Sequence, residues 1–185
     1  MPPLQTSPSF GRSLFVLGGA RSGKSRHAQA VAEAAAASFA GPLVYIATAQ
    51  AFDDEMRDRI ARHRTDRDAR WQTVEAPTQL AAALRGVDDA NTVVLVDCLT
   101  LWLSNLLLAD LDIDQEVDVL LATLACAQAR IILVSNEVGL GIVPDNALAR
   151  RFRDAAGLLH QRLAAQVDSV DGLMAGLVQS WKRPV

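Results

Sequence analysis

The chain has 185 residues, of which 50% are hydrophobic and 21% are charged, and its formal net charge at pH 7 is −3. This length and composition predict a globular chain with a buried core and exclude general disorder. The small negative charge gives no broad cationic surface, so no nucleic-acid partner is expected. No apolar run reaches the length of a membrane helix, so no membrane span is expected either.

The first third of the chain alternates strand and helix patterns. Residues 1–12 contain three prolines and no apolar run, which predicts a flexible leader before a single domain over residues 13–185. The apolar run Ser13–Leu17 ends in glycines and predicts a strand, and the alanine-rich segment Lys24–Phe39 predicts a helix. Leu43–Ala47 is β-branched and aromatic, which is typical of a buried strand.

The rest of the chain continues this alternation. Helices are expected over Asp53–Arg64, Thr78–Arg85, Cys98–Leu108, Asp114–Ala129 and Pro144–Gln166. Further strands are expected over Thr73–Ala76, Thr92–Val96 and Ile131–Val134, and within Val170–Val178. Together these elements predict an α/β fold with a mostly parallel sheet and helices on both faces.

A phosphate-binding motif joins the first strand to the first helix. The segment Gly18-Gly19-Ala20-Arg21-Ser22-Gly23-Lys24-Ser25 fits G-x-x-x-x-G-K-[ST] in the strand–loop–helix context that this motif requires. Glycines let the loop curl so that its backbone amides point at phosphate oxygens. Lys24 is expected to reach the β- and γ-phosphates, and the Ser25 hydroxyl is expected to bind Mg²⁺. The alternative is an ordinary glycine-rich turn before a helix, which the flanking pattern disfavours.

A carboxylate ends a second apolar strand. Asp97 follows Thr92–Val96, at the edge of a parallel sheet where a nucleotide-bound Mg²⁺ lies in P-loop enzymes. Aspartate also favours turns, so this feature alone does not identify a site. The phosphate-binding motif makes Asp97 the second expected Mg²⁺ ligand.

His63 has two interpretations. It shares a helical stripe with Met56 and Ile60, which is typical of a packed histidine. Six arginines lie nearby in the sequence: Arg57, Arg59, Arg62, Arg64, Arg67 and Arg70. They form either a solvated face or a cluster that stabilises a triphosphate while neutral His63 attacks its α-phosphate. The residues alone leave both readings open, whereas His27 and His160 lack such a cluster and are expected to pack.

Two other features are less specific. Ser135–Asn146 follows a strand end and contains two glycines before a helix start, so it is either a substrate-contacting loop or a long connector. Cys98 and Cys126 both lie in apolar runs, which predicts buried, reduced thiols and a cytoplasmic location.

Several long motifs in order resemble one family, the bifunctional adenosylcobinamide kinase and adenosylcobinamide-phosphate guanylyltransferases of cobalamin biosynthesis. The resemblance covers about Leu14 to Ala175. Its motifs are GGARSGKSRHA from Gly18, YIATA from Tyr45, DDEMRDRIARHR from Asp53, WQTVEAP from Trp71, VLVDCLTLWLSNLL from Val94 and VSNEVGLGIVPDNALARRFRDAAG from Val134. The tail Gly172–Val185 departs from the family pattern, so relatives' contacts there are not carried over.

This resemblance implies two reactions in one protein. ATP or GTP would phosphorylate adenosylcobinamide, and GTP would then transfer GMP through a histidine to adenosylcobinamide phosphate, giving adenosyl-GDP-cobinamide. The histidine of the family's R-I-x-x-H pattern falls on His63. The resemblance also implies a RecA-like P-loop fold and a homotrimer. It leaves open which nucleotide is the kinase donor and whether one pocket serves both reactions.

The resemblance carries a set of site residues onto this chain. His63 and Lys24 would be catalytic, and Ser25 and Asp97 would bind Mg²⁺. The nucleotide contacts would be the loop Gly18–Ser25 together with Thr48, Ala49, Arg64, Thr65, Asp66, Arg67, Glu75 and Asp97. Two other classes of function fit the phosphate loop itself: a kinase with a structural histidine, which would never be guanylylated, and a nucleotide-switched assembly protein without turnover.

Overall fold

A computed structural model describes residues 10–50 and 69–184 of the chain. Its strands are β1 (Ser13–Gly18), β2 (Leu43–Ala47), β3 (Trp71–Glu75), β4 (Val93–Asp97), β5 (Arg130–Asn136), β6 (Ser169–Met174) and β7 (Leu177–Lys182). Its helices are α1 (Lys24–Phe39), α3 (Leu80–Gly86), α4 (Leu99–Leu108), α5 (Ile113–Cys126) and α6 (Ala147–Gln166). The helix expected over Asp53–Arg64 lies outside the described residues.

The described strands form one seven-stranded sheet in the order β3-β2-β4-β5-β1-β6-β7. All neighbouring strands are parallel except β6 and β7, which are antiparallel. The predicted mostly parallel α/β sheet is therefore confirmed. One strand, β5, separates β1, which precedes the phosphate loop, from β4, which ends in Asp97. This separation is the strand arrangement of RecA-like P-loop folds.

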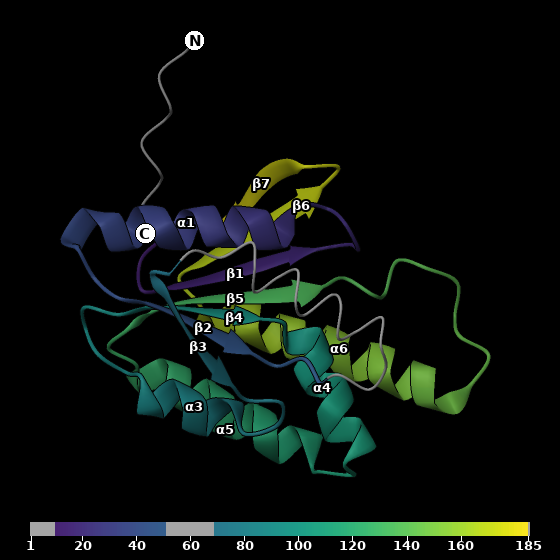
Figure 1. Cartoon of the computed structure of the whole chain (residues 1–185). Coiled ribbons are helices and arrows are strands. Elements are labelled where there is room, and N and C mark those ends of the chain that lie inside the picture. Colours follow the sequence, from purple (N-terminus) through teal and green to yellow (C-terminus); the bar gives the residue numbers. More distant parts are fainter. Residues whose placement is uncertain (1–9, 51–68, 185) are drawn as a thin grey trace.

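The sheet has a hydrophobic core on each face. Alternate residues of β1, β4 and β5 pack with α1 on one face. The intervening residues of the same strands pack with α3, α4, α5 and α6 on the other face, where Trp102 is 1% exposed (Figure 1). Strand side chains alternate between faces, so the face of any strand-end residue follows from its place in this alternation.

The starts of two helices are fixed by side-chain caps. Asp112 accepts a hydrogen bond from the Gln115 amide at the start of α5, and Asn146 accepts one from the Ala149 amide at the start of α6. Helix α6 was expected to begin at Pro144 but begins at Ala147. Asn146 explains the shift, because its extended backbone and side-chain oxygen suit a cap better than a helix interior.

The N-terminal end of the described chain packs against the start of β6. Residues 10–12 were assigned to the leader, but Phe10 is 4% exposed and packs in the core on the α1 face. The Arg12 amide donates to Asp168 at 2.7 Å, and the Ser169 hydroxyl donates to the Phe10 carbonyl at 3.0 Å. These contacts place residues 10–12 in the folded body, which corrects the predicted leader boundary.

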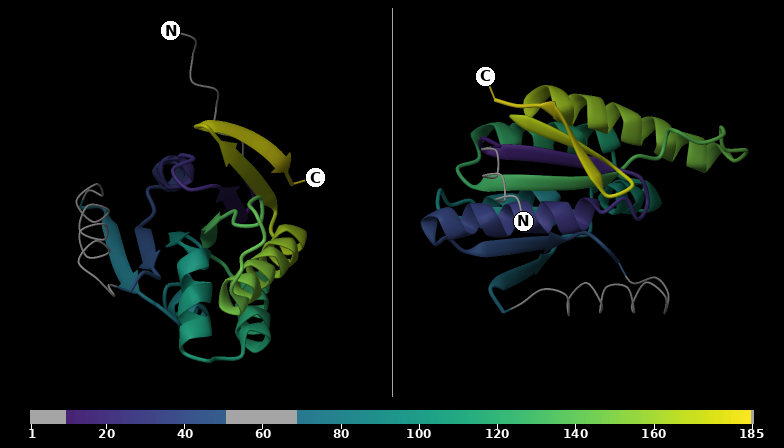
Figure 2. Two further views of the ribbon diagram at one scale, coloured as in Figure 1. Left: turned by 90° about the vertical axis from the view of Figure 1, so that its right-hand side faces the viewer. Right: turned by 90° about the horizontal axis from the view of Figure 1, so that it is seen from above.

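The C-terminal segment forms a hairpin where a single strand was expected (Figure 2). Ala175 and Gly176, both with positive φ, make the turn between β6 and β7. Asp171 on β6 is buried and binds both His27, at 2.9 Å, and Arg183, at 2.6 Å. Sequence patterns did not reveal β7 because nearly all its residues are exposed and show no apolar alternation.

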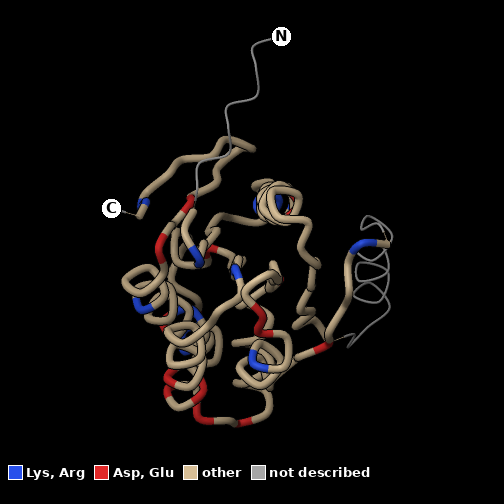
Figure 3. Tube along the Cα trace, turned by 90° about the vertical axis from the view of Figure 1, so that its left-hand side faces the viewer, with Lys and Arg blue, Asp and Glu red and all other residues tan. Residues whose placement is uncertain are grey.

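Negatively charged side chains are unevenly spread over the described residues. Acidic residues gather around the start of α5 (Figure 3). Asp110 and Asp112 precede the helix, and Asp114 and Glu116 lie in its first turn. Cys98 is buried as expected, whereas Cys126, at the exposed end of α5, is not, so the prediction of two buried thiols is wrong for Cys126.

No helix in the described part of the chain is long and apolar enough to cross a membrane.

Candidate functional site

The predicted phosphate loop lies between β1 and α1. Arg21 and Gly23 have positive φ angles of 56° and 96°, and the Ser22 amide donates to the Gly19 carbonyl at 3.3 Å. No side chain caps the start of α1, and its first turn contains no acidic residue. The amides there are thus left without a side-chain acceptor, at the positive end of the helix dipole, which is an arrangement suited to phosphate.

Gly18 is required by the close approach of the chain around it. A Cβ atom at this position would lie 2.6 Å from both the Leu173 carbonyl oxygen and the Ser22 Oγ. Ser22 itself is buried, and its Oγ has no hydrogen-bond partner among the described residues. Gly18 therefore lets the loop fold back tightly and bury the Ser22 hydroxyl against β6.

Lys24 is held over the loop. It is the first residue of α1 and is 9% exposed, and its Nζ donates to the Gly19 carbonyl at 3.3 Å. The ammonium group is therefore positioned by the loop's own backbone. Of the other loop residues, Ala20 and Arg21 are exposed and Ser25 is half-buried.

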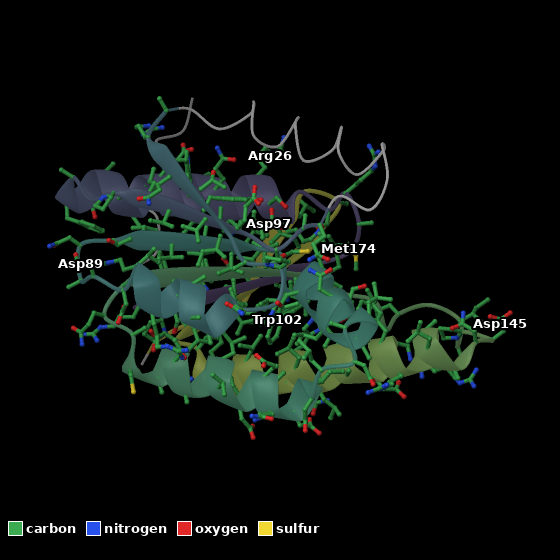
Figure 4. The ribbon with its side chains drawn as sticks, turned by 60° about the horizontal axis from the view of Figure 1, so that its bottom comes forward. Arg26, Asp89, Asp97, Trp102, Asp145 and Met174 are labelled. Atoms are coloured by element: carbon green, nitrogen blue, oxygen red, sulfur yellow. The ribbon has the colours of Figure 1, made fainter. Side chains whose placement is uncertain are left out.

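Strand register brings several predicted residues into one row along the edge of the sheet. Ala47 pairs with Glu75 on one side and with Asp97 on the other. Asp97 pairs with Val134 of β5, and Gly18 pairs with Asn136, two residues further along the same strand. Registered partners in parallel strands share a face, so this row lies on the α1 face, beside the phosphate loop. Figure 4 shows Asp97 and Arg26 near the start of α1.

Thr48 lies in a different environment from the registered strand-end residues of this row. It is fully buried on the opposite face, and its hydroxyl donates to the Cys98 carbonyl at 2.7 Å and accepts from the Cys98 amide at 2.9 Å. Its own carbonyl accepts from the Asn105 side chain at 2.8 Å. Thr48 thus fixes the backbone that follows Asp97, while Ala49, half-buried, comes next in the chain.

A chain of hydrogen bonds runs from the end of β5 to α6. The Asn136 amide donates to Thr100 Oγ1 at 2.8 Å, Thr100 contacts Ser135 Oγ at 3.3 Å, and Ser135 contacts His160 Nε2 at 2.8 Å. Thr100 Oγ1 also accepts from the Cys98 thiol at 3.6 Å. Either hydroxyl can donate in the contact between Thr100 and Ser135, and the other ring nitrogen of His160, Nδ1, faces Glu137 Oε2 at 4.0 Å.

Burial sets the protonation of two groups near the site. It raises the pKa of the Cys98 thiol, and the negative charge of Asp97 raises it further. Burial also lowers the pKa of His160, with Glu137 opposing in part. Both shifts favour the neutral form of the group. His160 and the Asp171-bound His27 therefore have structural contacts, as the sequence predicted.

The other predicted site residues form one segment that the structure does not describe. His63, Arg64, Thr65, Asp66 and Arg67 all lie within residues 51–68, outside the described residues. Their nucleotide contacts and the role of His63 remain predictions. Asn136 lies in the segment Ser135–Asn146, which was expected to be either a substrate-contacting loop or a connector, whereas no sequence pattern marked Thr100 or Asn105.

The donor set at the row suits Mg²⁺. Ser25 offers a hydroxyl oxygen from the first turn of α1, and Asp97 offers a carboxylate at the end of β4, on the α1 face. Mg²⁺ prefers oxygen ligands and commonly takes one or two from the protein, filling its shell with phosphate and water. These two residues fit a magnesium–nucleotide complex at the phosphate loop.

Comparisons with known proteins agree with this geometry. A family model described as "Cobinamide kinase / cobinamide phosphate guanyltransferase" matches residues 14–180. A "Bifunctional adenosylcobalamin biosynthesis protein CobP" from Pseudomonas aeruginosa is 53% identical over 165 residues, covering 88% of this chain and 93% of that protein. Two proteins named "Bifunctional adenosylcobalamin biosynthesis protein CobU", from Salmonella typhimurium and Escherichia coli, are each 40% identical over 179 residues, covering 89% of this chain and 96% of each of theirs.

Proposed function

This chain belongs to the cobinamide kinase / cobinamide phosphate guanyltransferase family, and from that premise we propose how its residues carry out both reactions. It is a bifunctional transferase of cobalamin biosynthesis that uses nucleoside triphosphates as substrates. It phosphorylates adenosylcobinamide and then guanylylates the resulting phosphate to give adenosyl-GDP-cobinamide. One observation carries the proposal: the phosphate loop that leads into α1 lies on the same face of the sheet as Asp97.

In the kinase reaction, the loop amides and Lys24 bind the β- and γ-phosphates. The Lys24 ammonium exchanges its contact with the Gly19 carbonyl for phosphate oxygens. It thereby offsets the negative charge that builds up on the leaving diphosphate during transfer. The Thr48–Cys98 contact keeps Asp97 in place throughout, because the backbone beyond Asp97 is bonded on both its amide and carbonyl sides.

We include Mg²⁺ in this proposal, held by Ser25 and Asp97. When bound, it neutralises charge on the phosphate oxygens. The protein's part is to present two oxygen ligands from elements whose relative position is set by the sheet and by α1. ATP and GTP both satisfy these contacts, since the loop binds phosphates and does not contact the base.

In the guanylyl reaction, His63 is the proposed nucleophile. Its neutral imidazole attacks the α-phosphorus of GTP, the bond to pyrophosphate breaks, and a GMP–histidine intermediate forms. The oxygen of adenosylcobinamide phosphate then displaces the imidazole. Arg64, Thr65, Asp66, Arg67 and Glu75 are the proposed further contacts to the nucleotide. The support for these roles is the R-I-x-x-H pattern and the strong similarity to bifunctional relatives.

We further propose a homotrimer in the cytoplasm. The described surface has large exposed apolar side chains on the C-terminal hairpin, among them Leu177 at 75% and Trp181 at 57%. Exposed apolar groups of this size on one strand are typical of contacts between subunits. The buried thiol of Cys98 suits a reducing compartment.

A product assay tests this function. Purified protein is incubated with adenosylcobinamide, Mg²⁺ and either ATP or GTP, and the corrinoids are identified by mass spectrometry. We expect adenosylcobinamide phosphate with either nucleotide, and adenosyl-GDP-cobinamide only with GTP. A phosphate product that never becomes the GDP derivative would reduce the enzyme to a kinase. The absence of both products would contradict the proposal.

A further inference from the structure

Asn136 has a buried polar atom that no described residue uses. Three buried side-chain oxygens lack a hydrogen bond among the described residues: Ser22 Oγ, Asn136 Oδ1 and Asp171 Oδ1. Ser22 belongs to the phosphate loop, and Asp171 Oδ1 lies 2.6 Å from an Arg183 nitrogen in an ion pair. The Asn136 oxygen has neither explanation. Buried polar groups are normally bonded, so this oxygen is free to accept a hydrogen bond from a group outside the described residues, such as a substrate.

The strand alternation assigns Asn136 to the face of the phosphate loop. In β5, Ile132 and Val134 pack in the core on the α1 face, whereas Ile131 and Leu133 pack in the core on the opposite face. Asn136 continues the first series. Its neighbour Ser135 continues the second, in agreement with its contacts to Thr100 and His160 on that side.

Asn136 lies between the two halves of the nucleotide site. Its strand, β5, separates β1 from β4. Asn136 pairs with Gly18, where the phosphate loop begins, and lies two residues beyond Val134, the partner of Asp97. The carboxamide therefore comes from the strand between the phosphate loop and the proposed Mg²⁺ ligand, at the edge where the γ-phosphate is expected.

The backbone at Asn136 is fixed before any substrate arrives. Its amide donates to Thr100 Oγ1 at 2.8 Å, and the next amide, that of Glu137, donates to the Gly18 carbonyl at 3.0 Å. Thr100 is held in turn through Ser135 and His160. A side chain mounted on such a rigid support is suited to orienting a reacting group.

The chemistry of the unpaired atom restricts its ligand. A carboxamide oxygen accepts hydrogen bonds and never donates them, so it does not pair with a phosphate oxygen. The kinase substrates contain one hydroxyl donor that must approach the γ-phosphorus, the alcohol that becomes phosphorylated. We propose that Asn136 is a catalytic residue of the kinase reaction whose Oδ1 accepts a hydrogen bond from this attacking hydroxyl.

This contact orients the hydroxyl for transfer and rests on the proposed function. The hydroxyl oxygen forms a bond to the γ-phosphorus, and the bond from that phosphorus to the β–γ bridging oxygen breaks. Its electron pair leaves with the nucleoside diphosphate, and the hydroxyl proton passes to an oxygen of the transferred phosphoryl group. Asn136 takes no proton, and its effect is on alignment, which contributes strongly to phosphoryl transfer.

Two substitutions of similar size test the proposal. Asn136→Leu removes the acceptor oxygen, and Asn136→Asp keeps it. Each variant is assayed separately for phosphorylation of adenosylcobinamide and, with adenosylcobinamide phosphate supplied, for guanylyl transfer. We expect kcat for phosphorylation to fall about 100-fold in Asn136→Leu and clearly less in Asn136→Asp. In Asn136→Leu, which adds no charge, the KM for nucleotide and the guanylyl-transfer rate should change by less than about threefold, because the acceptor hydroxyl takes no part in either.

The two assays separate this role from a structural one. Equal losses in both reactions, or a melting temperature that falls in step with the activity, would show that Asn136 only supports the fold and would overturn the proposal. Phosphorylation at the wild-type rate in Asn136→Leu would overturn it too. A wild-type enzyme that does not phosphorylate the corrinoid would instead contradict the proposed function itself.

Discussion

The Thr48 hydroxyl bonds both polar groups of the Cys98 backbone, donating to the carbonyl at 2.7 Å and accepting from the amide at 2.9 Å. Thr48 follows β2, and Cys98 follows β4, so this one side chain ties the ends of two neighbouring strands. Asp97 lies directly between the apolar run of β4 and Cys98. The position of the proposed Mg²⁺ ligand therefore depends on a threonine whose hydroxyl is buried and bonded to the backbone of Cys98.

Removing the Thr48 hydroxyl should destabilise the protein strongly. Thr48→Val preserves shape but leaves the buried Cys98 amide and carbonyl without their partner, at a cost of about 2–4 kcal/mol in the free energy of unfolding. Thr48→Ser keeps the hydroxyl and loses one methyl group, costing about 1 kcal/mol. Urea unfolding of the two variants measures the difference. Equal losses would mean that the contact with Cys98 contributes little.

Two glycine substitutions should change two different properties, one weakening nucleotide binding and the other raising the free energy of unfolding. Gly18→Ala places a Cβ atom 2.6 Å from the Leu173 carbonyl oxygen, so the loop or β6 must move, and nucleotide binding should weaken by at least about tenfold. Gly157 lies within α6, and a Cβ there meets no atom within 4 Å. Gly157→Ala should stabilise the protein by about 0.5–1 kcal/mol. Calorimetric binding and unfolding measurements test both, and normal binding by Gly18→Ala would contradict the described packing.

Lys24 should be essential for phosphorylation. Lys24→Met keeps the buried aliphatic stem and removes the charge that offsets phosphate during transfer. We expect kcat/KM for phosphorylation to fall about 10²–10³-fold with little change in the urea midpoint. Lys24→Arg keeps the charge in a different geometry and should retain more activity than Lys24→Met. Near wild-type phosphorylation by Lys24→Met would show that Lys24 does not contact the transferring phosphate.

Stability should fall on mild acidification because of His160. Burial lowers the pKa of His160 below its ordinary value, so the unfolded chain binds a proton at higher pH than the folded chain does. The stability linked to this group is complete above the unfolded pKa of about 6.5 and is lost as pH falls toward the lower folded pKa. The urea midpoint should therefore drop from pH 7.5 to 5.5, and drop less in His160→Gln. Equal drops in the two proteins would exclude His160 as a cause.

Sequence patterns predicted the sheet and the phosphate loop because both depend on short, local signals. The strand–loop–helix context around Lys24 and the apolar run before Asp97 each occupy adjacent residues, and the structure has these elements with shifts of at most one residue at their ends. Strand β5 was expected to end at Val134 but continues to Asn136. Its last residues, Ser135 and Asn136, are polar, so an apolar pattern could not include them.

Features that depend on distant partners could not be predicted. The bond between Thr48 and Cys98 joins residues 50 positions apart, and that between Ser13 and Asp168 joins residues 155 apart. The hairpin strand β7 shows no apolar alternation, and Phe10 is buried although it follows a proline-containing stretch of the sequence that suggested a flexible leader. Each of these depends on tertiary packing, which the local sequence does not encode.

The most direct test of bifunctional catalysis follows the label from α-labelled GTP. Wild-type protein, His63→Ala and the matched control His27→Ala are incubated with the nucleotide and Mg²⁺, and protein-bound label is measured before and after adding adenosylcobinamide phosphate. We predict label on the wild type and on His27→Ala that passes to the corrinoid, and no label on His63→Ala. Label that persists on His63→Ala, or a GDP-corrinoid formed without any labelled protein, would contradict the account.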